Sequence, residues 1–125
     1  MNQVNFNGLS KYCSLYELDL NSNLIKNIDL SPLSLIKSLQ IVDIGYNKIV
    51  SIDLNQLFGS NIHELYLSYN EVTNIDFSPL HSGRINLKYL SLDGNPLNDQ
   101  NIRSQYQLLA NLERNNTLKV ILKRY

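Results

Sequence analysis

Apolar residues recur along the chain in one arrangement that is repeated four times. Each copy ends in an asparagine, and these asparagines are spaced 24, 23 and 25 residues apart. Before each asparagine stand three apolar residues, the last two separated by a single position, which predicts a short strand with one apolar face. In chain order the copies are Leu15, Leu18, Leu20 and Asn23; Leu39, Val42, Ile44 and Asn47; Ile62, Leu65, Leu67 and Asn70; and Leu87, Leu90, Leu92 and Asn95.

A second half-motif follows the first three copies, at 28–33, 52–57 and 75–80. Ser-Pro in two of them places a hydroxyl acceptor at a helix N-cap and proline at the first helical position, which predicts a short helical turn. Asp29, Asp53 and Asp76 recur at one position of this half-motif. We interpret them as turn caps on the outer face rather than as a ladder of metal ligands.

One copy cannot cover the apolar face of its own strand, so neighbouring copies are expected to stack with their strands in a parallel sheet. The asparagine at the end of each strand then lies where the chain turns away. Its buried amide needs partners, and backbone groups of the adjoining turns can supply them. Asn23, Asn47, Asn70 and Asn95 are therefore predicted to form a hydrogen-bonded ladder from copy to copy.

The four copies resemble the leucine-rich-repeat signature L-x-x-L-x-L-x-x-N-x-L. The resemblance implies an α/β fold: a right-handed solenoid with a parallel concave sheet, short helical turns on the convex side and a C-terminal capping helix. We expect a single domain over residues 1–125. It would divide into an N-terminal half-repeat or cap at 1–14, repeats at 15–38, 39–61, 62–86 and 87–97, and a C-terminal cap at 98–125. The degenerate half-motif at 4–9 fits either a cap or a longer array.

The period breaks after Asn95-Pro96-Leu97, where a helical pattern begins. Asn98 or Asp99 can cap this helix, and its apolar positions are Ile102, Tyr106, Leu109 and Leu112. A last strand is expected within 118–122. This arrangement is similar to the C-terminal cap of short intracellular leucine-rich-repeat proteins, although Gln107 and Thr117 depart from the residues usual there.

Lys plus Arg equals Asp plus Glu at 11 each, but the two signs are unevenly distributed. Residues 1–83 contain four basic and eight acidic side chains, and residues 84–125 contain seven and three, so the first part carries −4 and the second +4. Cys13 is the only cysteine and is expected to be buried. Without an intramolecular disulfide or a long apolar run, the sequence favours a cytoplasmic protein that does not enter a membrane.

Enzymatic chemistry finds little support in the sequence. His63 lies beside a strand and His81 in a convex loop, which does not favour a shared site. The five glycines are scattered among turns and form no phosphate-binding loop. We therefore predict no enzyme activity and no catalytic, cofactor-binding or metal-binding residues.

The concave side of the sheet is the predicted binding site. Strand residues that do not point into the core must point outward, and here they are rich in carboxylates and tyrosines. Five carboxylates and four tyrosines favour another protein as the partner, docked through a basic or amphipathic segment. The predicted residues are Glu17, Asp19, Ile41, Asp43, Tyr46, Glu64, Tyr66, Tyr69, Tyr89 and Asp93.

Two alternatives remain open at this stage. An incompletely covered edge strand at the N-terminal end would favour a structural, self-assembling protein. The basic last third would suit an RNA-associated subunit, although Lys119, Lys123 and Arg124 are few and lack interleaved aromatic residues. We accordingly expect a monomer or weak self-association, and favour protein over nucleic acid as the partner.

Overall fold

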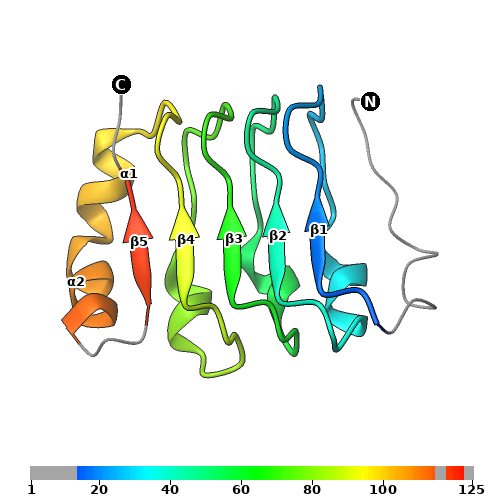
Figure 1. Cartoon of the computed structure of the whole chain (residues 1–125). Coiled ribbons are helices and arrows are strands. Elements are labelled where there is room, and N and C mark those ends of the chain that lie inside the picture. The colour runs from blue at the N-terminus through cyan, green and yellow to red at the C-terminus, as the bar shows by residue number, and fades with distance from the viewer. Residues whose placement is uncertain (1–13, 115–117, 123–125) are drawn as a thin grey trace.

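The computed structural model describes residues 14–114 and 118–122, which wind into a row of stacked repeats (Figure 1). Its sheet has the order β1-β2-β3-β4-β5, and every strand pairs in parallel with the next. The parallel sheet predicted from the repeat is therefore confirmed. The strands are β1 (Glu17–Asp19), β2 (Ile41–Asp43), β3 (Glu64–Tyr66), β4 (Tyr89–Ser91) and β5 (Lys119–Ile121).

The apolar positions of the repeat form one continuous core behind the sheet. In the second repeat Leu39, Val42 and Ile44 are completely buried, and the equivalent residues of the third and fourth repeats are buried as well. Leu18 and Leu20 in the first repeat are half-buried and pack against the same core. Each strand thus contributes its inward face to an interior shared with its neighbours, as stacked repeats require.

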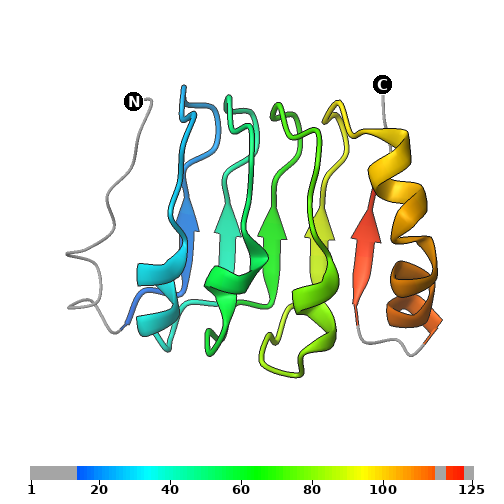
Figure 2. The same ribbon diagram turned by 180° about the vertical axis from the view of Figure 1, so that it is seen from behind.

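A layer of short 3-10 helices lies on the other side of the core, as Figure 2 shows from behind. These helices are η2 (Ser31–Leu35), η3 (Leu54–Leu57) and η4 (Ser78–His81). They confirm the predicted helical turns. We call the face of the sheet turned away from this layer the concave face.

Aspartates, and not serines, cap the convex turns. The N-cap residue of η2 is Leu30, so Ser31 lies inside the helix and the predicted role of the Ser-Pro serine is wrong. Asp29 accepts instead from the backbone N–H of Ser31, at 3.0 Å. Asp53 and Asp76 make the same bond to the N–H two residues on, at 3.0 and 2.9 Å. A carboxylate can reach that N–H from outside the helix, which is why these aspartates recur.

The C-terminal cap consists of two helices, α1 (Asp99–Ser104) and α2 (Tyr106–Arg114), followed by β5. The Asn98 side chain caps α1 by accepting from the N–H of Asn101. The prediction that Tyr106 lies on the apolar face of the helix is wrong, because its side chain is 70% exposed. Gln105 interrupts the helix and turns inward instead. Its side chain donates to the Ile75 carbonyl at 2.7 Å and accepts from the Phe77 N–H at 2.6 Å.

Gln105 therefore gives the third convex turn a polar partner. Gln56 does the same for the first convex turn, where its side chain accepts from the Leu30 N–H at 2.8 Å. A helix that merely covered apolar surface would not need this contact; the cap also satisfies backbone groups. The predicted half-repeat at 4–9 and Cys13 lie outside the described residues.

Candidate functional site

The strand register sets the predicted site residues in rows across the concave face. The first row is Glu17, Ile41, Glu64, Tyr89 and Lys119, and the second is Asp19, Asp43, Tyr66, Ser91 and Ile121. Acidic residues thus lie on β1, β2 and β3, tyrosines on β3 and β4, and a lysine on β5. The sequence predicted the last strand, but Lys119 and Ile121 were not assigned to the face, because the signature asparagine that aligns the other strands is missing there.

At the carboxyl ends of the strands, which we call the upper edge, one residue in each repeat adopts a left-handed backbone. These residues are Ser22, Tyr46, Tyr69 and Gly94, with φ of 63°, 55°, 58° and 76°. The turn after each of β1 to β4 imposes this conformation, since all four repeats adopt it. Only Gly94 adopts it without steric cost, so Tyr46 and Tyr69 occupy positions that disfavour a side chain.

Tyr46 and Tyr69 stack on each other along this edge. Their ring centroids are 4.7 Å apart and the ring planes differ by 16°. The Tyr69 ring lies over Gly94, where an added Cβ would stand only 2.5 Å from Cδ1 of the ring. The absence of a side chain at Gly94 therefore makes room for the stack. Both rings also remain accessible, with Tyr46 54% and Tyr69 38% exposed.

A second tyrosine pair lies in the middle of the face. The rings of Tyr66 and Tyr89 are 5.3 Å apart and tilted by 41°. The Tyr66 hydroxyl donates to Oε1 of Glu64 at 2.5 Å. This hydrogen bond, together with burial, raises the pKa of Tyr66 to about 12, because the bond requires the phenol proton. The Tyr66 phenol is thus held as a donor, in a fixed orientation.

Asn21 donates hydrogen bonds to both members of the carboxylate pair on β1 and β2, Asp19 and Asp43. Asp19 and Asp43 are direct neighbours in the register, as expected. The Asn21 side chain donates to Oδ1 of Asp43 at 3.2 Å, and the Gly45 N–H donates to the same oxygen at 3.0 Å. Oδ1 of Asp19 accepts from the Asn21 N–H at 2.9 Å. These hydrogen bonds offset part of the repulsion between the two carboxylates.

Asp93 lies in the row beyond the strands and is held by two hydroxyls. The side chains of Ser68 and Ser91 each donate to its Oδ1 at 2.5 Å. Its carboxylate therefore belongs to a cross-repeat network at the aromatic end of the face.

The signature asparagines join successive repeats. Oδ1 of Asn47 accepts from the N–H groups of Asn23 and Ile25 in the preceding repeat, both at 3.1 Å. Its Nδ2 donates to the carbonyls of Leu20, Ile44 and Gly45. Asn70 and Asn95 repeat this pattern, accepting from Ile49 N–H and Val72 N–H at 3.0 Å. Asn23 donates to carbonyls of its own repeat, Leu20 and Asn21.

A second set of polar side chains links the repeats at the amino-terminal ends of the strands, the lower edge. Ser38, Asn61 and Asn86 donate to the carbonyls of Leu15, Lys37 and Ser60, at 2.6, 2.8 and 3.4 Å. Sequence analysis missed this row. Its signal was the polar residue directly before the first apolar position of each repeat.

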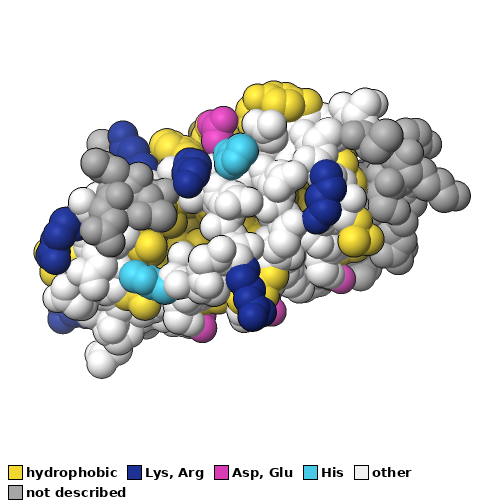
Figure 3. All heavy atoms as spheres, turned by 90° about the horizontal axis from the view of Figure 1, so that it is seen from below, with side chains coloured by type: hydrophobic (Ala, Val, Ile, Leu, Met, Phe, Trp, Pro, Cys, Tyr) yellow, Lys and Arg dark blue, Asp and Glu magenta, His cyan; other side chains and the backbone are white. Residues whose placement is uncertain are grey.

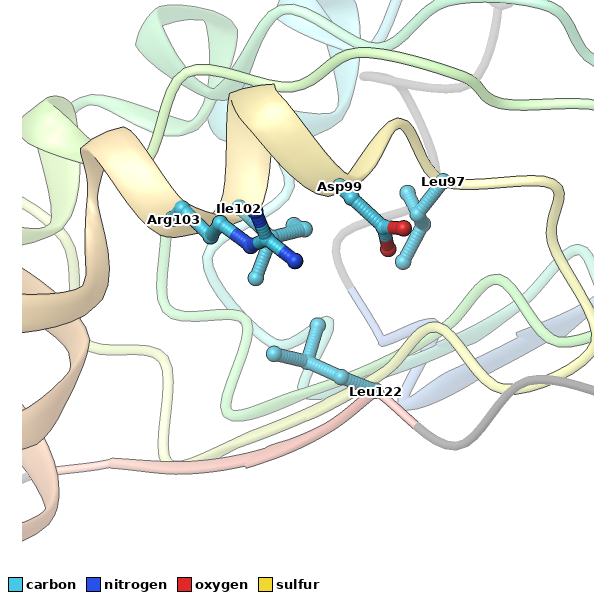
Figure 4. Close-up of a pocket in the computed structure, with 5 residues that line it drawn as sticks. All are labelled: Leu97, Asp99, Ile102, Arg103 and Leu122. Carbon is cyan, nitrogen blue, oxygen red and sulfur yellow. The ribbon is translucent and has the colours of Figure 1, made fainter.

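A pocket of about 350 Å³ lies apart from these rows, at the C-terminal end of the solenoid (Figure 4). Leu97, Ile102 and Leu122 supply apolar walls, while Asp99 and Arg103 extend from α1 beside them. It lies between the cap helix and the end of β5 and shares no residue with the concave rows.

The two histidines lie in separate environments. Nδ1 of His63 is 3.3 Å from Oε1 of Gln40, and Nε2 of His81 is 3.2 Å from the Leu108 carbonyl. Over residues 14–114 and 118–122, no three His, Cys, Asp or Glu side chains are grouped to hold a metal ion. In the same residues, no helix is both long and apolar enough to cross a bilayer.

Comparison with known proteins agrees with this architecture. The family model for leucine rich repeats matches residues 13–72. An internalin from Listeria monocytogenes has a similar structure, with a TM-score of 0.60 and 24% sequence identity over 98% of this chain. The chain spans about a third (32%) of that internalin. No curated protein has a matching sequence. Residues 13–72 match the leucine-rich-repeat family, and four repeats in register with their strands stacked in parallel give the chain the leucine-rich-repeat fold.

Proposed function

We propose that the chain is a non-catalytic interaction module that binds a partner protein on its concave face. Leucine-rich repeats generally mediate protein–protein interaction, which supports this class of function. The observation that carries the proposal is the pair of tyrosine contacts between adjoining repeats, Tyr46 with Tyr69 at the upper edge and Tyr66 with Tyr89 in the middle of the face.

Paired tyrosines suit a binding surface for two physical reasons. Each ring offers a large apolar area and a polar hydroxyl, the combination that is enriched among interface anchors. Rings that already contact one another have also lost part of their rotational freedom, so less entropy remains to be lost on binding. The backbone cost at Tyr46 and Tyr69 is then offset by a surface that is organised before the partner arrives.

The charges on the face favour a basic or amphipathic segment of the partner that crosses the strands. Glu17, Asp19 and Asp43 lie on β1 and β2, whereas Lys119 lies on β5 at the opposite end. A segment running across the sheet would therefore place its basic residues over β1 and β2. Its apolar residues would meet the tyrosines of β3 and β4.

Capture of partners from a lysate of the source cells, with intact protein and with a Tyr66→Ala/Tyr69→Ala variant, tests this proposal. For a partner retained only by the intact protein, each single substitution should weaken binding by about 1–2 kcal/mol, as central anchors do. Circular dichroism verifies that each variant is folded.

Asp43→Asn probes the charge alone, since asparagine keeps an oxygen for the Gly45 N–H. It should slow association and reduce its salt dependence, with a smaller effect on dissociation. Asp53→Asn, on the convex side, is the matched control and should leave binding unchanged. Loss of binding in the convex variant but not in the concave variants would show that the wrong face was chosen.

We also propose that the protein acts in the cytoplasm. The proposal rests on Cys13, because one cysteine cannot form an intramolecular disulfide of the kind common in small extracellular domains. Fractionation of the source cells tests it, and recovery from the medium or the cell surface would contradict it.

A further inference from the structure

The loops of the lower edge carry basic side chains and no acidic ones. Three loops lead from the convex turns to the strands there, at 36–40, 58–63 and 81–88, and none contains Asp or Glu. They contain Lys37, Arg84 and Lys88 together with both histidines. Figure 3 views the molecule from this side, and dark blue basic side chains and cyan histidines are spread over it, with a few magenta acidic side chains toward the rim. The loops of the upper edge, in contrast, mix Lys26 and Lys48 with Glu71 and Asp93.

Two of these cations are held in place across repeats. Nζ of Lys37 donates to the Ser34 carbonyl at 2.9 Å and to the Gly59 carbonyl of the next repeat at 2.7 Å. The Arg84 guanidinium lies over the Phe58 ring of the preceding repeat, 5.8 Å from its centroid. The Arg84 carbonyl also accepts from the Gly59 N–H at 3.0 Å. The positive charges are therefore carried by a rigid edge.

Apolar surface accompanies the charge. Leu35 ends η2 and is 65% exposed, and Phe58, which directly follows η3, is only half-buried. A purely electrostatic contact has no use for these side chains. Their position beside Lys37 and Arg84 fits a ligand that presents carboxylates and apolar groups together.

We propose that this lower edge is a second interface, which binds an acidic amphipathic segment of a partner protein. Charge complementarity identifies the chemistry of the partner, because two of the three loops carry Lys or Arg and none of the three carries a carboxylate. Nucleic acid fits less well. The single phenyl ring of these loops is covered by Arg84, and they contain no tyrosine or tryptophan on which a base could stack. The proposed interface shares no residue with the tyrosine-bearing concave face.

The probe is a fluorescent synthetic amphipathic helix with leucines on one face and glutamates on the other, titrated with the full chain. Arg84→Glu/Lys88→Glu should weaken its binding about tenfold, because two favourable charge contacts become repulsive. Lys26→Glu/Lys48→Glu makes the same charge change on the upper edge and should alter binding less than about twofold. Circular dichroism and thermal melts verify that both variants fold.

Three further measurements complete the test. A helix with glutamine in place of every glutamate should lose binding, and Tyr66→Ala, on the concave face, should leave it intact. A single-stranded oligonucleotide should bind more weakly than the acidic helix. The proposal is overturned if the acidic helix does not bind, if both charge-reversed variants lose affinity equally, if the glutamine helix binds as well, or if the oligonucleotide binds more tightly. The proposal is also overturned if Tyr66→Ala loses binding while the charge-reversed variants keep it, because the acidic helix would then bind on the concave face.

Discussion

The two edges of the solenoid use the same chemistry at very different depths. At the upper edge, Asn47, Asn70 and Asn95 are at most 5% exposed, and each bonds to backbone groups of its own and the preceding repeat. At the lower edge, Asn61 and Asn86 each donate one bond to the preceding repeat, from more exposed positions. Both rows tie one repeat to the next.

Burial decides what each row contributes. A backbone group that loses its partner inside the core cannot turn to water, so it costs the full penalty of desolvation. A carbonyl at the lower edge can accept from water instead. We therefore expect the upper row to determine whether the repeats stack, while the lower row only adjusts their stability.

Asn70→Leu is the strongest test of this difference. It removes the acceptor of the Ile49 N–H and the donor of the Ile44 and Leu67 carbonyls, all buried. Added apolar bulk cannot compensate, and the free energy of unfolding should fall by about 3 kcal/mol or more. Urea denaturation measures it. Asn74→Leu, at an exposed position, is the control and should change stability by less than about 0.5 kcal/mol. Equal stability of the two variants would contradict the ladder.

Gly94→Ala tests the left-handed turn at the upper edge. The new Cβ meets both an unfavourable φ of 76° and the Tyr69 ring. We expect a loss of about 1–2 kcal/mol from the backbone and a further loss from displacement of the ring. Gly59→Ala separates the two, because its φ is 79° but nothing lies within 4 Å of the added atom. If both substitutions cost the same in a thermal melt, the ring makes no contribution.

Asn61→Ala addresses the lower row. It removes one donor from the Lys37 carbonyl, which water can replace. The expected cost is about 0.5–1 kcal/mol, several times less than at Asn70. Urea denaturation of both variants under one set of conditions gives the ratio, and a ratio near one would remove the distinction between the edges.

The mildest test lies between the edges, at the hydrogen bond from Tyr66 to Glu64. The folded-state pKa of Tyr66, about 12, lies above its ordinary value of 10.0. The stability that the bond contributes is therefore present below pH 10 and is lost as the pH rises through 12. Tyr66→Phe should lose this pH-dependent part, and its difference absorbance from the intact protein should show a phenol that ionises late. A normal titration of that phenol would exclude the bond.

The sequence predicted the repeat, its parallel strands and the rows of the concave face because these depend on a strict apolar spacing. It could not place Tyr106, since an aromatic residue at helical spacing reads as core until the break at Gln105 is seen. The convex caps were assigned to the wrong residue because serine and aspartate are both good acceptors. In the structure Asp29 is the acceptor, and the hydrogen bonds from the Ser31 hydroxyl and the Ser31 N–H hold the pKa of Asp29 below its ordinary value.

The pairing of side chains on the concave face was also beyond the sequence. Alternation placed Tyr46, Tyr66, Tyr69 and Tyr89 on one surface, but only the ring positions distinguish two pairs from four separate residues. The lower row was missed for a different reason. One repeat has a serine at this position and the next two have asparagine. All three can donate a hydrogen bond, but they are different residue types, so the position is visible only as a recurring polar residue and not as a motif.

The asparagine ladder has a direction, with consequences while the chain is being synthesised. Asn47 completes the turn of the repeat before it, and Asn70 and Asn95 do the same for theirs. During translation each turn therefore waits for the next repeat to leave the ribosome, and the last convex turn waits for Gln105. A nascent chain that ends between two repeats therefore has one turn whose backbone N–H groups still lack their asparagine acceptor. Stability is then gained in steps, one per completed repeat, and the step that closes the array comes with the cap.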